Sequence, residues 1–245
     1  IAAEDTRVTV KLLNHLELKK PMVTYHRHNT ETAGPAILTR LLAGESCALV
    51  TDAGTPAISD PGEDLVALCA EAGVTVCAVP GPCALVTALS VSGLPTARFT
   101  FEGFLPMNRK NRRAQLGSLR LETRTMIFYE APHKLLSTLE DLAEAFGPDR
   151  RLSVCRELTK LHEEVLRTTV GGALAHFEGT QPKGEFVLVL EGAAPAEQAA
   201  GDPDAALERV NRLREEGLSL KEAAVQAAAE FGLKKKQLYD MAIGK

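Results

Sequence analysis

Residues 50–62 read VTDAGTPAISDPG and join a predicted buried strand, residues 46–51, to a predicted helix, residues 61–72. Nine of the twelve residues that follow Val50 are Gly, Pro, Asp, Ser or Thr. A simple connection between a strand and a helix needs only one or two such residues. The excess indicates that this connection does more than turn the chain.

The two halves of this connection have different predicted roles. At the carboxyl end of a parallel strand, ligands bind in the crevice, and the backbone there must approach them closely. The segment DAGTP (52–56) supplies a carboxylate, a residue without a side chain and a hydroxyl for such contacts. Asp60, Pro61 and Glu63 predict a capping box that fixes the start of the helix. A well-capped turn is the simpler alternative, but it explains only the second half.

A second connection, VPGPCA (79–84), repeats this construction. A predicted strand ends, Gly81 allows close approach of the backbone, and Pro82 begins a predicted helix. The free amides at a helix N-terminus suit an anionic group such as a carboxylate. We therefore expect the two loops to converge on one pocket. The chain has neither a Walker motif nor a GxGxxG fingerprint, which argues against an NTPase or a typical dinucleotide site.

Three further motifs place polar residues at predicted strand ends. In FYEAPHKL (128–135), Phe128 and Tyr129 could contact an aromatic ring of a ligand. RELTK (156–160) and KGEFVLVLEG (183–192) add charges at the ends of two more strands. A histidine at a helix start, such as His133, is more often a cap or a surface residue than a catalytic group.

Up to residue 192 the chain alternates short β-rich runs with helical stretches, which predicts an α/β fold with mainly parallel sheets. Residues 94–98 are predicted to join two α/β lobes, residues 1–95 and 96–192. The predicted strands are residues 1–3, 21–25, 46–51, 74–79, 98–103, 124–130, 151–157 and 185–191. The predicted helices are residues 6–16, 31–43, 61–72, 82–92, 109–121, 133–146 and 171–177.

The last part of the chain has a purely helical pattern. Residues 193–202 are mostly small and predict a flexible linker. Ser219 and Glu222 predict a capping box for the second of three short helices. Residues 203–245 are therefore similar to a helix-turn-helix unit. A three-helix lid or a dimerisation tail explains the spacing equally well.

Composition limits the class of protein. The chain has 245 residues, a net charge of −4 and five cysteines without a CxxC pair. Its apolar runs are too short to span a bilayer, and it opens without a signal-peptide pattern. These features predict a cytoplasmic protein in a reducing compartment. Three cysteines in apolar runs are expected in the core: Cys47, Cys69 and Cys77.

Six motifs, in their order and spacing, closely resemble the ribosomal RNA small subunit methyltransferase I family. They are DAGTPxISDPG, PGPCA, GFLP (103–106), FYExPHK, RELTK and KGExVLVxEG. That family belongs to the tetrapyrrole methylases, or class III S-adenosylmethionine-dependent methyltransferases. The resemblance covers nearly the whole chain. It implies the two-lobed tetrapyrrole-methylase fold with S-adenosylmethionine bound in a cleft between the lobes, and a homodimer.

The resemblance also implies which residues bind this cofactor. The first loop would line its methionine and ribose part, the second would contact it through the backbone, and Tyr129, Cys155 and residues 185–187 would flank the adenosine end. The implied cofactor-binding residues are Asp52, Ala53, Gly54, Thr55, Pro80, Gly81, Cys83, Ala84, Tyr129, Cys155, Glu185 and Val187.

One departure from the family pattern concerns the start of the chain. Members normally begin with a strand and a loop that forms one wall of the cofactor site. Here IAAEDTR (1–7), which lies downstream of that loop in relatives, comes first. We expect the 245-residue chain to bind the cofactor poorly and to expose a sheet edge.

The activity implied by the resemblance is methylation of the ribose 2′-oxygen of a P-site cytidine in 16S rRNA, within the small ribosomal subunit. Positioning can contribute roughly 7–11 kcal/mol to such a transfer and a general base about 10²–10⁴-fold, so positioning should dominate. The candidates for a base or an orienting group, none of which the sequence singles out, are Glu130, His133, Glu157, Lys160 and Glu185.

Two basic segments predict contacts with RNA phosphates, which would make affinity dependent on salt. A solvated surface is the plainer explanation of such runs. Aromatic residues make up only 4% of the chain, so recognition would rest on phosphates and shape more than on stacked bases. The predicted RNA-binding residues are Arg109, Lys110, Arg112, Arg113, Lys234, Lys235 and Lys236.

Three alternatives were weighed against this function. The same fold could methylate a tetrapyrrole or a protein, or the chain could be a non-enzymatic ligand sensor with a nucleic-acid-binding helix-turn-helix. The basic loop, the helical tail and the DAGTP form of the first loop favour the ribosomal RNA substrate. His26 and His28 with Glu31 could ligate zinc, but methyl transfer from a sulfonium needs no metal, so we expect none.

Overall fold

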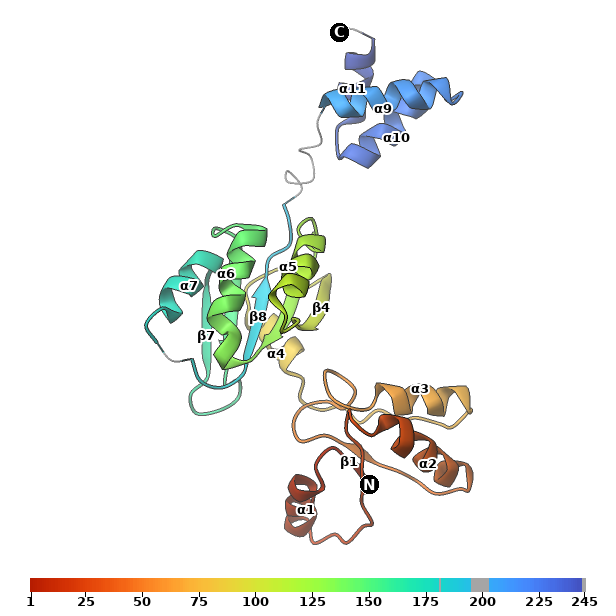
Figure 1. Cartoon of the computed structure of the whole chain (residues 1–245), viewed down its shortest axis with the longest axis vertical. Coiled ribbons are helices and arrows are strands. Elements are labelled where there is room, and N and C mark those ends of the chain that lie inside the picture. Colours follow the sequence, from red (N-terminus) through yellow and green to blue (C-terminus); the bar gives the residue numbers. More distant parts are fainter. Residues whose placement is uncertain (181, 195–202, 244–245) are drawn as a thin grey trace. The chain divides into compact units, whose positions relative to one another are not determined.

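The computed structural model describes residues 1–180, 182–194 and 203–243. The chain divides into two compact units, Ile1–Ser90 and Val91–Lys245 (Figure 1). The boundary between them lies near the predicted joint at residues 94–98. The predicted linker, residues 193–202, lies outside the described residues from position 195 onward. No helix in the described ranges is long and apolar enough to cross a membrane.

The first unit contains a parallel sheet of three strands in the order β2-β1-β3, which confirms the predicted parallel α/β arrangement. Its strands are β1 (Ala2–Ala3), β2 (Val23–Thr24) and β3 (Leu49–Val50). Its helices are α1 (Thr6–His15), α2 (Thr30–Leu42), α3 (Glu63–Glu71) and α4 (Ala84–Val91), the last of which ends one residue inside the second unit. The core joins sheet and helices through Ala2, Tyr25, Ile37, Leu65 and Cys69.

The predicted strand at residues 74–79 is wrong. Its alternating valines favour a strand, but within the described residues this segment pairs with no other strand. A strand forms only where a neighbouring strand offers backbone donors and acceptors. Val76 and Val79 are therefore exposed, at 51% and 87%. Cys47 and Cys77, which the sequence places in the core, are exposed as well, whereas Cys69 is buried.

The predicted capping box at the start of α3 does not form. The helix begins at Glu63, and its N-cap is Gly62, which makes no side-chain cap hydrogen bond. Gly62 has φ +147°, a conformation that residues with a side chain rarely adopt. A Cβ atom there would lie 2.6 Å from Leu49 Cδ2 and 3.2 Å from Ala57 Cβ. The close packing of the loop against β3 fixes this helix start at Gly62.

Replacing Gly62 with alanine should lower the free energy of unfolding by about 2–3 kcal/mol, because backbone strain at such a position costs about 1–3 kcal/mol and a clash is added. Gly73→Ala is the matched control, since Gly73 has φ +70° but no atom within 4 Å of an added Cβ. In Gly73→Ala the free energy of unfolding should fall only by the cost of a left-handed backbone conformation, about 1–2 kcal/mol. Urea unfolding measures both variants, and equal losses would contradict the packing explanation.

The second unit contains a five-stranded sheet in the order β4-β5-β8-β6-β7. Only the β4–β5 pair is parallel, so the prediction of mainly parallel sheets is wrong for this unit. The strand missed by the sequence prediction, β7, forms a hairpin with β6, and β8 inserts antiparallel between β5 and β6. The strands are β4 (Phe99–Phe104), β5 (Thr125–Glu130), β6 (Arg151–Arg156), β7 (Glu164–Thr169) and β8 (Phe186–Leu190).

The two faces of this sheet differ because side chains alternate along each strand. One face packs against helices in a core that includes Phe128 of β5, Val154 of β6 and Leu188 of β8. The helices on this face contribute Leu116, Leu139 and Ala173 among others. They are α5 (Arg109–Ser118), α6 (Leu135–Phe146), which follows the 3₁₀ turn η1 (Pro132–Lys134), and α7 (Val170–Phe177).

The C-terminal helices form a bundle with its own core, which confirms the predicted helical segment. They are α9 (Pro203–Glu215), α10 (Leu220–Phe231) and α11 (Lys235–Ala242). The predicted capping box is present, since Ser219 and Glu222 exchange side-chain and backbone hydrogen bonds. Gly232, with φ +67°, ends α10 in the left-handed conformation typical of a helix C-terminus. Val210, Ala227 and Leu238 are buried between the three helices.

Candidate active site

The two predicted loops of the first unit are in contact. The Thr55 hydroxyl donates a hydrogen bond to the Pro82 carbonyl oxygen at 2.8 Å. Gly54 has φ +78°, and an added Cβ would lie 3.9 Å from the same oxygen. At the base of the first loop, the Asp52 amide donates to Glu4 Oε2 at 3.2 Å. The structure therefore brings together residues 52–55 and 80–84, as the sequence predicts.

These loops present backbone and small side chains to solvent. Asp52, Ala53, Gly54 and Gly81 are exposed, so a ligand can approach their main chain. The first loop continues through two non-glycine residues in the left-handed region, Ala57 at φ +68° and Ser59 at φ +62°. Such strained residues concentrate at ligand-binding and active sites. The pair of loops has the geometry of a binding site for a small polar ligand.

The second loop ends at the first turn of α4. The Cys83 carbonyl oxygen accepts from the Thr87 hydroxyl at 2.9 Å and from the Thr87 amide at 3.0 Å. Pro80 and Ala84, on either side of this turn, are exposed. Backbone contact with a ligand is therefore possible at both positions.

In the second unit, three predicted cofactor-binding residues form one row across the sheet. Val187 of β8 lies opposite Tyr129 of β5 and Cys155 of β6. Directly opposed residues point to the same face, and this face is the one opposite the helix-packed core. Val187 and Cys155 are buried, and Tyr129 is partly buried. Glu185, the fourth predicted residue, precedes β8 and is exposed.

Two aromatic residues that the sequence prediction did not include pack against Tyr129. The ring of Phe101 lies 4.9 Å from it and that of Phe104 5.5 Å, both edge to face. Phe104 is the second residue of the GFLP motif, which was a signal for this position. Edge-to-face packing of this kind fixes the orientation of an aromatic ring. Tyr129 is therefore held by β4 rather than free to rotate into solvent.

Cys155 is a neutral thiol at neutral pH. Burial, the largest influence, raises its pKa, and a hydrogen bond with the Ser153 hydroxyl, 3.7 Å from the sulfur, offsets this only in part. A raised pKa leaves little thiolate, which is the nucleophilic form. Its side chain is fully buried, so it supports the sheet beneath Tyr129 and is not an activated nucleophile.

The five candidate catalytic residues gather at one end of the same sheet. In the register, Glu130 pairs with Phe186, and Phe186 pairs with Arg156. Residues that follow β5 and β6 and those that precede β8 therefore lie at this shared end. The residues concerned are Glu130, His133, Glu157, Lys160 and Glu185. The strand register places these residues at the end of the sheet that follows the Tyr129 row, and their chemical roles stay predictions.

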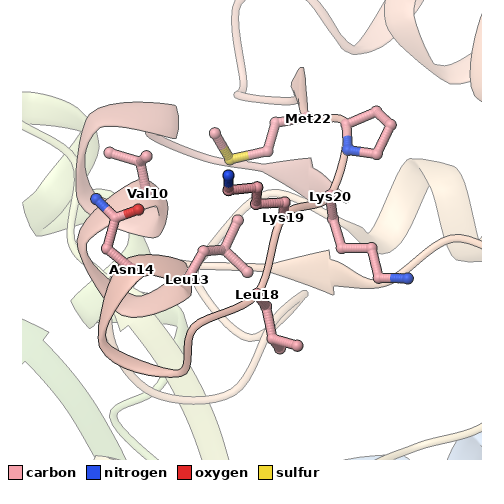
Figure 2. Close-up of a pocket in the computed structure, with 8 residues that line it drawn as sticks. Val10, Leu13, Asn14, Leu18, Lys19, Lys20 and Met22 are labelled. Carbon is pink, nitrogen blue, oxygen red and sulfur yellow. The ribbon is translucent and has the colours of Figure 1, made fainter.

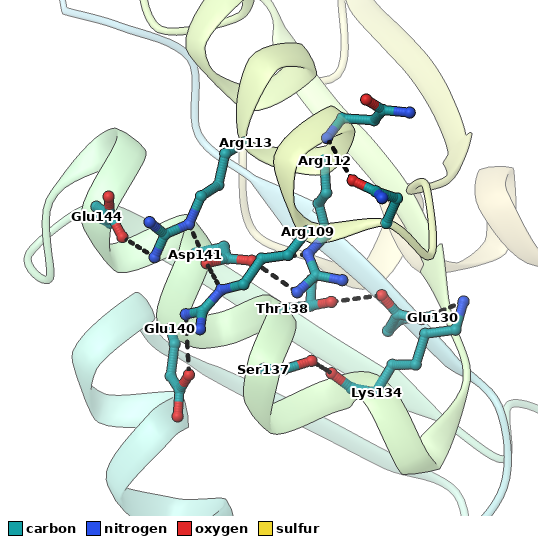
Figure 3. A network of polar contacts seen from close by, with 12 residues as sticks. Arg109, Arg112, Arg113, Glu130, Lys134, Ser137, Thr138, Glu140, Asp141 and Glu144 are labelled. Atoms are coloured by element: carbon teal, nitrogen blue, oxygen red, sulfur yellow. Dashed lines mark hydrogen bonds and ion pairs between the residues drawn. The ribbon is translucent and has the colours of Figure 1, made fainter.

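Glu130 has a structural role that the sequence did not reveal. Its side chain is 1% exposed and accepts hydrogen bonds from the Thr138 hydroxyl at 2.6 Å and the Ala131 amide at 2.8 Å (Figure 3). Lys134 Nζ lies 3.8 Å away. These contacts tie the end of β5 to the start of α6. A carboxylate so enclosed cannot reach a substrate hydroxyl directly, which argues against Glu130 as the general base.

Glu157 begins a tight loop between β6 and β7. It has φ +51°, and Thr159 in the same loop has φ +64°. The Glu157 carboxylate accepts from Lys160 Nζ at 2.9 Å and packs against Gly184, where an added Cβ would lie 2.5 Å from Glu157 Oε1. The RELTK and KGE motifs are thus in contact. This strained, polar loop next to Glu185 is a stronger candidate for substrate positioning than Glu130.

The basic segment of α5 is largely neutralised by acidic residues of α6 (Figure 3). Asp141, whose side chain is fully buried, accepts from Arg109 Nε at 3.0 Å, from Arg112 Nε at 2.7 Å and from Arg113 Nε at 2.9 Å. Glu140 pairs with Arg109, and Glu144 pairs with Arg113. The Arg112 side chain is only 5% exposed. Its burial argues against the predicted direct contact of Arg112 with an RNA phosphate.

Other cations in the predicted RNA-binding set remain accessible. Lys110 is exposed on α5, and Lys234, Lys235 and Lys236 are exposed at the start of α11. None of these four lysines forms an ion pair with a described residue. They carry the uncompensated positive charge that a phosphate contact requires.

A hollow of about 390 Å³ lies between α1 and residues 18–22 (Figure 2). Its walls are apolar at Val10, Leu13 and Met22, and Lys19 and Lys20 extend from its rim in different directions. None of the predicted site residues lines it. The described residues also contain no group of three or more His, Cys, Asp or Glu side chains that could hold a metal ion.

Comparison with known proteins places this geometry in a family. Residues 1–174 match the family model for Tetrapyrrole (Corrin/Porphyrin) Methylases, and residues 199–245 match the model for the RsmI C-terminal HTH domain. The chain is 47% identical to ribosomal RNA small subunit methyltransferase I of Synechocystis sp., over 99% of its own length and 87% of the relative's. The chain belongs to the ribosomal RNA small subunit methyltransferase I family.

Other relatives in the ribosomal RNA small subunit methyltransferase I family are similarly close. The chain is 48% identical to the protein of Xylella fastidiosa, over 98% of the chain and 87% of the relative. It is 45% identical to the protein of Escherichia coli O157:H7, over 99% of the chain and 85% of the relative. Both relatives carry the family name. Identity at this level along the whole chain spans every motif described above.

Solved structures support the fold. The methyltransferase CobJ superposes with a TM-score of 0.53 at 17% identity, covering 79% of this chain and 93% of that one. Diphthine synthase superposes with a TM-score of 0.52 at 13% identity, covering 74% and 73%. At such low identity the likeness concerns the fold alone. Together with the family model over residues 1–174, it confirms the predicted tetrapyrrole-methylase fold.

Proposed function

We propose that the chain is an S-adenosylmethionine-dependent methyltransferase that modifies the ribose 2′-oxygen of a cytidine in 16S rRNA of the small ribosomal subunit. The observation that carries this proposal is identity of 45–48% to three curated small-subunit rRNA methyltransferases along nearly the whole chain. The contact between the two loops of the first unit adds support, because the family resemblance assigns both loops to the cofactor site.

The residues present fit the cofactor. S-adenosylmethionine supplies an activated methyl group on a cationic sulfonium. The exposed main chain of residues 52–55 and 80–84 offers donors and acceptors to its amino-acid and ribose groups, with Asp52 supplying a carboxylate. In the Tyr129–Val187–Cys155 row, Tyr129 is the member with a partly exposed side chain, so it is the one that we propose packs against the adenine ring. The exposure of the two loops and of Tyr129 therefore fits the cofactor, whereas Val187 and Cys155 are buried behind that contact.

The chain's own contribution to the reaction is positioning. Tyr129 is oriented by Phe101 and Phe104, and the Thr55–Pro82 hydrogen bond holds the two loops in one arrangement. Well-aligned reactants gain roughly 7–11 kcal/mol from such preorganisation. Glu157 and Lys160, joined by an ion pair in a strained loop, are the residues that we propose orient the acceptor ribose.

The proposed partner is 16S rRNA within the assembled small subunit. Of the predicted contacts on α5, Lys110 is the one with accessible, uncompensated charge, and Arg109 and Arg113 expose about half of their side chains. The homodimer implied by the family resemblance also stays a proposal, and sedimentation of the chain tests it directly.

Lys110→Glu should weaken binding to small ribosomal subunits, and the loss should be larger at low salt. Each phosphate contact changes the salt slope of the binding constant by roughly 0.7–0.9, so the slope should fall by about one to two units on charge reversal. Lys11→Glu, an equal charge change on an exposed residue of α1, should leave the slope nearly unchanged. Filter binding across a salt series measures both variants, and equal slopes would contradict a phosphate contact at Lys110.

The proposed activity is tested with methyl-labelled S-adenosylmethionine and a panel of acceptors. The chain is mixed with small subunits, large subunits, naked 16S rRNA or duplex DNA. We expect label in the RNA of small subunits. Label in a protein, in large subunits only, or in none of the acceptors with cofactor bound would overturn the proposed acceptor.

A further inference from the structure

The C-terminal bundle carries a basic depression outside the proposed cofactor and acceptor sites. It has a volume of about 350 Å³ and is lined by Lys221, Lys235, Lys236 and Tyr239. Lys221 comes from the first turn of α10 and the other three residues from α11, so two helices build it. Tyr239 is 36% exposed and lies next to Leu238, which is buried in the bundle core.

Positive charge in this bundle is compensated unevenly. Arg209 pairs with Glu216 and Glu230, and Arg212 pairs with Glu208, whereas Arg214 forms no ion pair with a described residue. The lysines of the depression form no ion pair with a described residue, and the first turn of α11 contains no acid. Cations near a helix N-terminus are unfavourable to the helix itself. The lysines of the depression destabilise the helix and have no acidic partner among the described residues. Residues that break a local stability rule in this way are expected where they serve a function, which here is the binding of an anion.

We infer that this depression binds a single-stranded RNA segment, with Lys221, Lys235 and Lys236 contacting phosphates and Tyr239 packing against a base or ribose. Ammonium groups bind phosphate as point charges, and an exposed aromatic ring beside them provides the stacking surface that single strands use. The inference rests on the proposed function, since it takes ribosomal RNA as the ligand class. It adds a second contact, far along the chain from the methyl-transfer residues.

Duplex DNA fits this surface less well. A helix-turn-helix that reads DNA inserts its second helix as a ridge into the major groove and contacts base edges from its first residues. Here the first residues of α11 are lysines, and the surface beside them is hollowed rather than protruding. The helix also has only eight residues. A concave surface of this kind suits one or two nucleotides of a single strand.

The test measures binding of the full chain to a short fluorescein-labelled oligouridylate and to a DNA duplex of the same length. Lys235→Gln with Lys236→Gln should weaken oligouridylate binding about tenfold at low salt and lower the salt slope by about 1.4, since each single-strand phosphate contributes roughly 0.7. Tyr239→Ala should weaken binding severalfold at an unchanged slope, and Tyr239→Phe should bind normally. Arg212→Gln with Arg214→Gln, the same charge change in the same bundle, should have less than a twofold effect.

Three results would overturn the inference. These are an equal loss in the arginine control, tighter binding of the DNA duplex than of oligouridylate, or unchanged affinity in both the lysine and the Tyr239→Ala variants. The melting temperature of the lysine variant should be equal to or slightly above that of the parent chain, because the substituted side chains are exposed and their charges are unfavourable at the helix start. Cofactor affinity of the lysine variant, measured by calorimetry, should also be unchanged. The two proposals can fail separately. If the chain binds oligouridylate as expected but transfers no methyl label to small subunits, the proposed function is wrong and this inference stands.

Discussion

Replacing Asp141 with asparagine should lower the free energy of unfolding by about 3–5 kcal/mol, the usual cost of leaving a buried charge without its partner. The Asp141 side chain is fully buried and bonds to three guanidinium groups. Two of these arginines expose about half of their side chains and can turn to water, but Arg112 is 5% exposed and cannot. An asparagine amide keeps the volume and removes the negative charge. Urea unfolding of the variant and the parent chain measures the loss.

Glu144→Gln is the matched control. Glu144 also pairs with Arg113, but its side chain is 60% exposed, and an ion pair between solvent-exposed side chains contributes little. The free energy of unfolding of the Glu144→Gln variant should stay close to that of the parent chain. Similar losses in the two variants would mean that Asp141 acts only as one more surface charge, and the buried-network explanation would be wrong.

The same carboxylate predicts a dependence of stability on pH. Burial, the largest single influence, raises the pKa of Asp141, but hydrogen bonds from Arg113, Arg112 and Arg109 together outweigh it, so the pKa is lowered. Because the pKa of Asp141 is lower in the folded chain than in the unfolded chain, its ionised carboxylate stabilises the fold at any pH above the unfolded-state pKa of about 3.9. This stabilisation is lost as the pH falls through the folded-state pKa. The difference in stability between the parent chain and Asp141→Asn should therefore shrink on acidification below about pH 4.

Asp52→Ala should weaken binding of S-adenosylmethionine by about 10- to 100-fold, since a hydrogen bond to a charged group contributes roughly 1.5–3 kcal/mol. Asp52 is exposed at the tip of β3, on the loop that Thr55 joins to Pro82. Its carboxylate is the one acidic group that DAGTP contributes to the first loop. Isothermal titration calorimetry of the chain with the cofactor measures the change, and an unchanged dissociation constant would contradict the assignment.

Asp64→Ala controls for loss of charge in the same unit. Asp64 is exposed in the first turn of α3 but lies outside the two loops. Its removal should leave cofactor affinity within about twofold of the parent chain, as for most surface substitutions away from a site. Gly81→Val provides an independent check, because a branched side chain on the second loop would obstruct the main chain that we propose contacts the cofactor. Equal affinity of all three variants and the parent would place the cofactor elsewhere.

Local sequence signals predicted much of this fold because they act through nearest neighbours. The Ser219 and Glu222 capping box, the left-handed Gly232 and the continuous apolar runs of β5 and β8 all depend on residues a few positions apart. The contact between the two loops of the first unit was also predicted, but only the first loop follows a described strand, so the expected cause, neighbouring carboxyl ends of parallel strands, applies to one loop of the pair.

Features that depend on distant partners were not predictable from the sequence. The run MNRKNRR indicates positive charge, but nothing in it reveals that Arg112 will be buried against an aspartate 29 residues away. Residues 74–79 have a strand pattern, yet no described strand pairs with them. Glutamate often acts as a catalytic base, but the hydrogen bond that Glu130 accepts from Thr138 forms only because α6 packs beside the end of β5.

The chemical position of the transferred methyl group tests the central claim most directly. RNA from small subunits labelled by the chain is hydrolysed with alkali, which cleaves a linkage only where the neighbouring 2′-oxygen is free to attack. A methyl group on the ribose 2′-oxygen should leave the label in an alkali-resistant dinucleotide that contains cytidine. Label released in mononucleotides would place the methyl group on a base and contradict the proposed reaction.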